Sequence, residues 1–247
     1  YTKKYFYPKQ GIGQIFEFVS REIKQNGGNI ILNARFIKLL LEGDRVKGVI
    51  YETNGKDQVI NCDWVISTIP VTDLICMPDR GVGYQDVSTA IRSLSFRSLR
   101  FLNILIDKPE IGRNTWTYIP DGKYIMTRIQ EPKKRSPYNA PDAKTSLMLE
   151  IPCSYNDEVW NMQDDLLFNR CIDDLFKLGI NIKDRVIDYF YTAEKHAYPI
   201  YHLEYKHHLN RLFSWIAAIE NIHTCGRNGL FRYIFMDRAM EMGFDAA

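Results

Sequence analysis

The chain contains a succession of short apolar segments of strand length, and Gly, Pro, Asp or Asn interrupts them at most of their ends. Strands bounded by such turn residues favour antiparallel sheets over a sheet built only from crossover helices. Gly43-Asp44 and Asn54-Gly55 are typical hairpin connections, so a hairpin or three-stranded meander is expected near the start of the chain. The candidate strands are residues 29–36, 36–43, 45–52, 58–62, 97–107, 115–119, 124–130, 144–151, 186–194 and 221–226.

Four segments show helical periodicity. Residues 12–26 place Ile15, Val19 and Ile23 on one face, and Gly27-Gly28 follows as a stop signal. Residues 163–178 repeat apolar side chains at helical spacing, and Gly179 is suited to the position after the last turn. Further helices are expected near residues 208–220 and at the C-terminal end. Helices and antiparallel strands in this order predict an α+β fold.

Composition narrows the classes of ligand. Lys plus Arg (32) nearly balances Asp plus Glu (30), so the net charge of +2 gives no support for nucleic-acid binding. No apolar run approaches the ~20 residues needed to span a bilayer. The five cysteines are scattered without Cys-x-x-Cys spacing, which predicts free and mostly buried thiols and no metal site. We therefore expect an intracellular, cytoplasmic protein.

The segment Cys225–Gly243 holds the strongest candidate site. Gly226 and Gly229 let backbone N–H groups approach a ligand, Arg227 supplies a cation, and a helix is expected to follow. A phosphate or a flavin requires such groups, although a glycine-bounded loop before an ordinary helix fits the same residues. Residues 64–70 read as a buried strand that opens into a loop at Pro70, and ligands gather at such strand ends in open α/β sheets.

Other motifs carry less information. Gly11-Ile12-Gly13 and Gly81-Val82-Gly83 do not follow buried strands, so neither is expected to be a dinucleotide fingerprint. Arg128 interrupts an apolar strand and must reach either an anion or solvent. Tyr198-Pro199 could place a phenol at a pocket rim or form a structural corner. The basic run Lys133-Lys134-Arg135 is interpreted most simply as a solvated loop.

Several of these pieces resemble, in order, the FAD-dependent amine oxidase and protoporphyrinogen oxidase superfamily, in particular its UDP-galactopyranose mutase-like subset. The resemblance covers nearly the whole chain, and its specific parts are the segment ending in ISTIP and the Gly-Arg-x-Gly-x-x-x-Tyr motif. The segments that carry it are YPKQGIGQIFEFVSREIKQNGGNI, DWVISTIP, TRIQEPKKRSPYNAP, HAYPIY and CGRNGLFRYIFMDRAMEMG.

The resemblance implies part of an FAD-linked α/β two-domain fold: an incomplete FAD-binding domain with an inserted antiparallel-sheet substrate domain. Residues 1–72 would be the middle piece of the FAD domain, 73–219 the substrate domain, and 220–247 the return to the FAD domain. The N-terminus of the last helix would face the flavin and stabilise negative charge on its reduced form. The implied cofactor-binding residues are Gly226, Arg227, Gly229, Met236, Asp237, Arg238 and Ala239.

The resemblance also implies a substrate site. Positions similar to Arg128, Tyr198 and Tyr233 hold a substrate diphosphate in the mutases, and an arginine fork suits phosphate oxygens. Two departures from the family pattern stand out. Relatives often have Asp-His where this chain has Asp237-Arg238, and the strand with Gly-x-Gly-x-x-Gly is absent. The chain, which opens on a polar aromatic segment without Met, is therefore expected to be a fragment that binds FAD weakly or not at all.

Three functional hypotheses follow. The first is an FAD-dependent oxidoreductase that transfers a hydride from a small substrate to flavin in the full-length parent. The second is a flavin-dependent sugar-nucleotide mutase, in which reduced flavin is a nucleophile without net redox change. The third is an inactive structural fragment. The expected partner is a small molecule, with a sugar nucleotide as one candidate, and a homodimer is a possible assembly.

Overall fold

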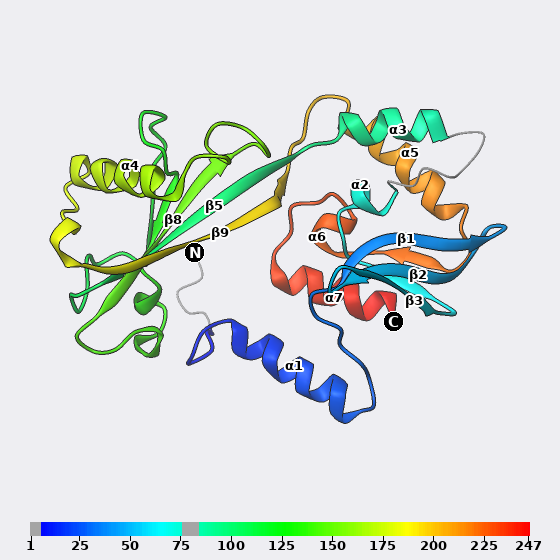
Figure 1. Ribbon diagram of the computed structural model, residues 1–247, viewed down its shortest axis with the longest axis horizontal. Coiled ribbons are helices and arrows are strands. Elements are labelled where there is room, and N and C mark those ends of the chain that lie inside the picture. Colours follow the sequence, from blue (N-terminus) through cyan, green and yellow to red (C-terminus); the bar gives the residue numbers. More distant parts are fainter. Residues whose placement is uncertain (1–5, 76–83) are drawn as a thin grey trace. The chain divides into compact units, whose positions relative to one another are not determined.

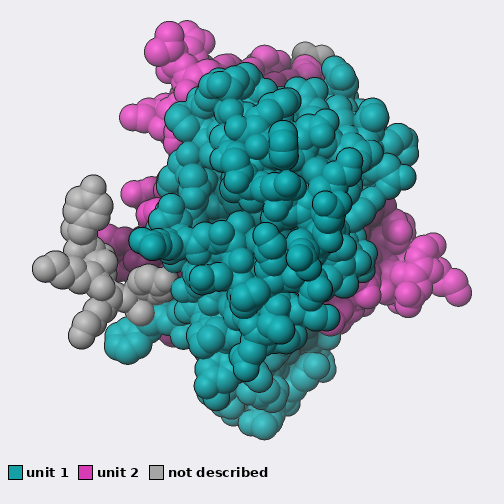
Figure 2. All heavy atoms as spheres, turned by 90° about the vertical axis from the view of Figure 1, so that its left-hand side faces the viewer, with its two compact units in different colours: residues 1–30, 97–197 teal, residues 31–96, 198–247 magenta. Residues whose placement is uncertain are grey.

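The computed structural model describes residues 6–75 and 84–247, which form two compact units (Figure 1, Figure 2). Unit 1 comprises residues 1–30 and 97–197, and unit 2 comprises residues 31–96 and 198–247. These boundaries differ from those implied by the family resemblance, which lie after residues 72 and 219. The FAD-domain and substrate-domain roles of the pieces stay predictions. Cys76 and the Gly81-Val82-Gly83 motif lie outside the described residues.

Unit 1 is built on a five-stranded sheet with the strand order β6-β7-β8-β5-β9. The β6–β7, β7–β8 and β5–β8 pairs are antiparallel. Leu149 of β8 lies opposite Leu102 of β5 on one side and Ile129 of β7 on the other. The strands are β5 (Phe96–Ile106), β6 (Trp116–Tyr118), β7 (Arg128–Gln130), β8 (Thr145–Cys153) and β9 (Val186–Pro199).

Helix α4 (Asp164–Lys177) packs on this sheet because its apolar residues recur at helical spacing (Figure 1). Leu167, Cys171 and Leu175 share one core with the buried leucines of β5 and β8. Gly179 follows the helix with φ +82°, as its sequence position predicts. The amphipathic helix predicted for residues 12–26 is α1 (Gly13–Gln25). Short 3₁₀ turns at Pro132–Lys134, Pro137–Asn139 and Lys183–Arg185 complete the unit.

Unit 2 contains the predicted meander, in which β2 pairs antiparallel with both β1 and β3. The strands are β1 (Arg35–Glu42), β2 (Arg45–Thr53) and β3 (Lys56–Asn61). The prediction of a strand at residues 29–36 is wrong except for Arg35 and Phe36, which begin β1. Asn33 takes a left-handed conformation with φ 53°. That conformation is incompatible with an extended strand.

A second, two-stranded sheet in unit 2 pairs β4 (Val65–Ser67) in parallel with β10 (Ile222–Thr224). Helices α2 (Val71–Leu74), α3 (Tyr84–Ser93) and α5 (Tyr205–Ala217) contribute to the core, and α3 was not predicted. Short α6 (Gly226–Gly229) and α7 (Met236–Ala246) end the chain. The mixed α+β class with antiparallel sheets is therefore confirmed. No helix within residues 6–75 and 84–247 is long and apolar enough to cross a bilayer.

The four cysteines in the described part of the chain are free thiols, as expected. Burial raises the pKa of Cys171 to about 12 and that of Cys153 to about 11. Burial also raises the pKa of Cys62, but this thiol is only half-buried and is the most accessible of the four. Among the four described cysteines, we expect iodoacetamide at about pH 8 to label Cys62 first and Cys171 last, because the reactive species is the exposed thiolate. Peptide mass spectrometry checks this order, with labelling in denaturant as the control. Equal native labelling of Cys62 and Cys171 would contradict it.

Candidate functional site

The predicted Gly-Arg site lies where the two parallel strands of unit 2 end. Ser67 ends β4 beside Thr224 at the end of β10, with which it is in register. The N–H of Cys225 donates to the Ser67 carbonyl oxygen at 2.9 Å, which holds the start of the Gly-Arg turn against the end of β4. The turn therefore occupies the carboxyl end of a parallel strand pair, a position where α/β proteins bind ligands.

The two glycines of the turn are required by different physical constraints. Gly226 has φ +77°, a left-handed conformation that favours glycine. Gly229 packs so closely that an added Cβ would lie 2.7 Å from the Thr224 Oγ1 and 3.2 Å from the Ser67 carbonyl oxygen. Thr224 Oγ1 also donates to the Gly229 carbonyl oxygen at 3.0 Å. These contacts seat the turn directly on the two strand ends.

Replacing Gly229 by Ala is expected to destabilise unit 2 by about 1 to 3 kcal/mol, because the methyl group would overlap buried atoms. The matched control is Gly243→Ala in exposed α7, where an added Cβ meets nothing within 4 Å. That control should be neutral or stabilise the helix by about 0.5 to 1 kcal/mol. Urea unfolding compares the two variants, and equal stability of both would show that the packing at Gly229 is loose.

The Arg227 side chain contacts two tyrosine rings of unit 2. Its guanidinium carbon lies 4.7 Å from the ring centroid of Tyr198 and 4.6 Å from that of Tyr233. The two ring centroids are 5.6 Å apart with the planes tilted by 35°. The structure thus brings together one predicted cofactor residue and two predicted substrate residues. Sequence reasoning missed this contact, because 29 residues separate Tyr198 from Arg227 (227 − 198) and no local pattern signals it.

Aromatic packing holds this group in place. Phe231 is fully buried with φ 48°, and its ring meets that of Phe96 edge-on at 4.9 Å. The hydroxyl oxygen of Tyr201 accepts a hydrogen bond from the N–H of Tyr233 at 2.6 Å. A bulky residue in a left-handed conformation costs free energy and persists only where its surroundings enforce it. Phe231 therefore anchors the loop that carries Tyr233.

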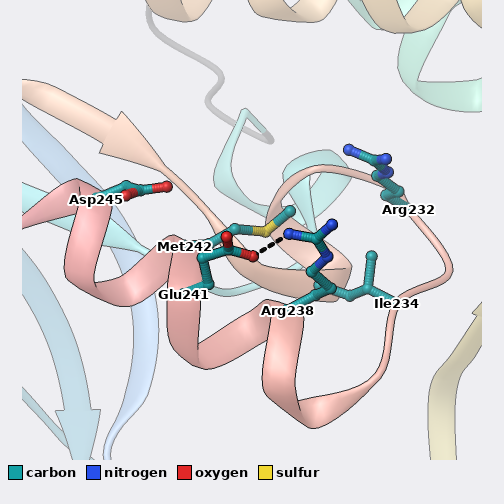
Figure 3. Close-up of a pocket in the computed structure, with 6 residues that line it drawn as sticks. All are labelled: Arg232, Ile234, Arg238, Glu241, Met242 and Asp245. Carbon is teal, nitrogen blue, oxygen red and sulfur yellow. Dashed lines mark hydrogen bonds and ion pairs between the residues drawn. The ribbon is translucent and has the colours of Figure 1, made fainter.

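The four predicted residues on the first turn of α7 are close to solvent. Met236, Asp237 and Arg238 are exposed and Ala239 is half-buried. Asp237 complements the positive end of the helix dipole. Arg238 forms an ion pair with Glu241 one turn further on, as Figure 3 shows. This pair belongs to a pocket of ≈ 280 Å³ lined by Arg232 and Ile234 from the preceding loop and by Arg238, Glu241, Met242 and Asp245 from α7.

Three buried polar atoms near the Gly-Arg turn have no hydrogen-bond partner within the described part of the chain: Ser67 Oγ, Arg227 Nε and Asn228 Oδ1. Buried polar groups in folded proteins are almost always hydrogen-bonded, so such atoms call for a specific explanation. A polar ligand at the strand ends would supply their partners. The residues present therefore fit a polar cofactor such as a flavin.

Arg128 lies in unit 1, on β7, and has an internal carboxylate partner. Its guanidinium forms an ion pair with Glu150 and also donates to the Tyr118 hydroxyl oxygen at 3.4 Å. The same Glu150 oxygen accepts from Gln130 Nε2 at 2.7 Å. Arg128 thus finds an anion within the protein, one of the two outcomes that its position predicts. Its grouping with Tyr198 and Tyr233 of unit 2 in a substrate site stays a prediction.

The basic run at residues 133–135 is not a solvated loop, so that interpretation was wrong. Lys133 Nζ donates to four backbone carbonyl oxygens at 2.7 to 3.1 Å, which satisfies an ammonium group without a carboxylate. Lys134 pairs with Glu110, and Arg135 donates to Gln130. The four carbonyl groups belong to Pro109, Pro141, Asp142 and Lys144.

The fold is shared with several solved structures. A crystal structure of reduced UDP-galactopyranose mutase matches with a TM-score of 0.79 and 20% identity, over 97% of this chain and 51% of that one. A putative protoporphyrinogen oxidase from Exiguobacterium sp. 255-15 matches with a TM-score of 0.69 and 17% identity, over 92% and 48%. A putrescine oxidase mutant matches with a TM-score of 0.65 and 14% identity, over 96% and 52%.

The chain belongs to the flavin-containing amine oxidoreductase family, whose model matches residues 1–247. The family resemblance predicted from the sequence is thereby confirmed. The chain spans about half the length of the solved structures that it matches. No curated protein matches the sequence.

Proposed function

We propose that the chain supplies one part of the flavin site of an FAD-dependent oxidoreductase, in which a hydride passes from a small substrate to the flavin. Membership of a flavin-containing family supports this proposal. The observation that carries it is the set of unpartnered buried polar atoms beside a glycine turn at the ends of two parallel strands. When bound, FAD supplies the hydride-accepting ring, which no side chain provides.

Three groups of residues in unit 2 would contribute to flavin binding: the glycines of the turn, two polar side chains and the first turn of α7. Gly226 provides the left-handed conformation of the turn and Gly229 lets the turn pack on the two strand ends, where its backbone would approach the cofactor. Ser67 and Asn228 would offer a hydroxyl and an amide oxygen. The first turn of α7, with Met236 and Ala239 at its ends, would direct its positive dipole end toward negative charge.

Ser67→Ala is expected to reduce FAD retention by the full-length protein without lowering the stability of the apoprotein. The Ser67 hydroxyl has no protein partner among the described residues, so its removal breaks no internal hydrogen bond. Ser93→Ala is the matched control and should leave FAD retention unchanged, because the Ser93 hydroxyl already donates to the Thr89 carbonyl oxygen within α3. FAD content is measured from visible absorbance after gel filtration, and stability by thermal unfolding. Unchanged FAD retention in Ser67→Ala would remove Ser67 from the site.

The full-length wild-type protein tests the proposal as a whole. A colourless preparation that cannot be reconstituted with FAD would overturn it. If FAD is retained, oxidation of a small substrate with oxygen or NAD as acceptor supports the oxidoreductase. Turnover of UDP-galactopyranose under reducing conditions, without net oxidation, would replace the oxidoreductase by the mutase hypothesis.

A further inference from the structure

A cage of backbone carbonyl groups surrounds the Lys133 ammonium in unit 1. Four carbonyl oxygens lie 2.7 to 3.1 Å from Nζ, and they belong to Pro109, Pro141, Asp142 and Lys144. An ammonium has three N–H donors, so the cage holds one acceptor more than the group can bond singly. This excess is typical of a site for a spherical cation, in which hydrogens do not limit the number of oxygens.

The oxygens of the cage are neutral and converge without a carboxylate. None of the ion pairs formed within residues 6–75 and 84–247 includes Lys133. Carbonyl dipoles that point at one another repel, so this arrangement requires a positive charge at its centre. Three of the four carbonyls come from one short turn, in which the N–H of Lys144 donates to the Pro141 carbonyl oxygen at 3.0 Å. The backbone therefore defines the site, and Lys133 supplies its charge.

The distances and the type of oxygen select a class of cation. Ca²⁺ takes its oxygens at about 2.3 to 2.6 Å and Mg²⁺ at about 2.0 to 2.1 Å, and protein sites for both are built largely on carboxylates. The cage is wider and carries no formal charge. Rings of backbone carbonyls instead replace the hydration shell of K⁺ in potassium-selective filters. A monovalent ion of the size of potassium or ammonium fits these four oxygens.

We propose that these four carbonyls form a monovalent-cation site that the chain fills with its own Lys133 ammonium. Once the Lys133 side chain is removed, the site takes a potassium ion or a small primary alkylammonium ion. The inference does not depend on the flavin proposal, because the cage lies wholly within unit 1 and uses none of the residues assigned to cofactor or substrate.

Occupation of the cage fixes a strap, residues 131–144, against the segment that precedes α1. Ser136 Oγ donates to the Lys9 carbonyl oxygen at 2.5 Å, and Lys9 Nζ lies 4.0 Å from the ring centroid of Tyr138. Lys133 lies near the start of the strap, and three of its carbonyl partners lie at the end. An empty cage should therefore loosen the strap together with residues 7–11, which it holds.

Chemical rescue of Lys133→Ala in the full-length protein tests this inference. The substitution removes the atoms of propylamine, so the probes are propylammonium chloride and potassium chloride. Tetramethylammonium chloride, whose cation is large and has no N–H, controls for ionic strength. We expect the midpoint of thermal unfolding to fall by roughly 5 to 10 °C, and hydrogen exchange of residues 7–11 and 132–139 to become faster. Propylammonium or potassium should reverse both changes with a saturable dependence on concentration.

Two matched variants separate binding in the cage from general salt effects. Lys133→Met also loses the ammonium but keeps a side chain of similar length in its place, so neither cation should restore its stability. Lys134→Ala breaks an ion pair with the single carboxylate of Glu110 and should respond equally to all three salts. Rescue of Lys133→Ala by either cation supports the inference. Rescue by propylammonium alone shows that the site requires N–H donors, and rescue by potassium shows that charge and size suffice.

Three results would overturn the inference: equal stability of Lys133→Ala in all three salts, equal rescue of either control variant, or wild-type stability of Lys133→Ala without an added cation. If Lys133→Ala does not fold, its refolding by dilution into each salt is measured instead. Failure to refold in both propylammonium and potassium then also overturns the inference.

Discussion

Asn221→Ala is expected to lower the free energy of unfolding of unit 2 by about 3 to 5 kcal/mol, because it leaves several buried backbone groups without partners. The side chain is fully buried and makes three hydrogen bonds. Its Oδ1 accepts from the N–H of Val46 at 2.8 Å, and its Nδ2 donates to the carbonyl oxygens of Val46 at 2.8 Å and Asp63 at 2.6 Å. One amide thus joins β2, the residues before β4 and the start of β10.

The control for this prediction is Asn161→Ala. The Asn161 amide also donates to two backbone carbonyl oxygens, those of Asn156 and Asp157, but it is exposed and its contacts are local. Water can replace the lost amide there, so a loss below about 1 kcal/mol is expected. Since two units can unfold separately, hydrogen exchange at β2 and β10 is the suitable measurement. Equal protection in wild type and Asn221→Ala would refute the structural role of the amide.

Arg128→Ala is expected to destabilise unit 1 by about 3 to 5 kcal/mol, because it leaves the charge of Glu150 buried with only an amide partner. The Glu150 side chain is 7% exposed and that of Arg128 is 26% exposed. Gln130 still donates to Glu150 in the variant but supplies no charge. Urea unfolding followed by hydrogen exchange at β7 and β8 measures the effect.

A second variant separates the structural role of Arg128 from substrate binding. Arg128→Ala combined with Glu150→Gln removes both charges, and should recover much of the stability lost in Arg128→Ala. If Arg128 also holds a substrate diphosphate, the stable double variant should still bind pyrophosphate more weakly than Glu150→Gln alone. Equal binding by these two proteins would leave Arg128 with its structural role only. A double variant as unstable as Arg128→Ala would contradict the buried-charge explanation.

Local patterns predicted many of the elements correctly. The apolar stripe of Ile15, Val19 and Ile23 identified α1, and the turn dipeptides at Gly43 and Asn54 identified the meander. Both signals depend on residues that are close in the sequence, where periodicity and turn conformation act directly. Gly179 correctly predicted the end of α4, because the signal depends only on the left-handed backbone conformation of that one residue.

Long-range contacts account for the failures. The run Lys133-Lys134-Arg135 looks solvated by composition, yet Lys133 is coordinated by carbonyl groups from segments before and after it. Asn221 carries no motif, although its amide joins segments up to 175 residues apart. Such roles depend on which distant backbone groups are left unsatisfied, a quantity that is defined only in the folded chain.

The sequence by itself determined the mixed α+β class, the family and the location of the Gly-Arg turn, because glycine spacing and hydrophobic periodicity are local properties of the chain. Only the tertiary structure showed that Gly229 is packed against the ends of two parallel strands, and that Arg227 lies close to the rings of both Tyr198 and Tyr233. These contacts join residues that are distant in the sequence. The free energy of each contact depends on how deeply the groups are buried and on which hydrogen-bond partners they have, and both are set only when the chain folds.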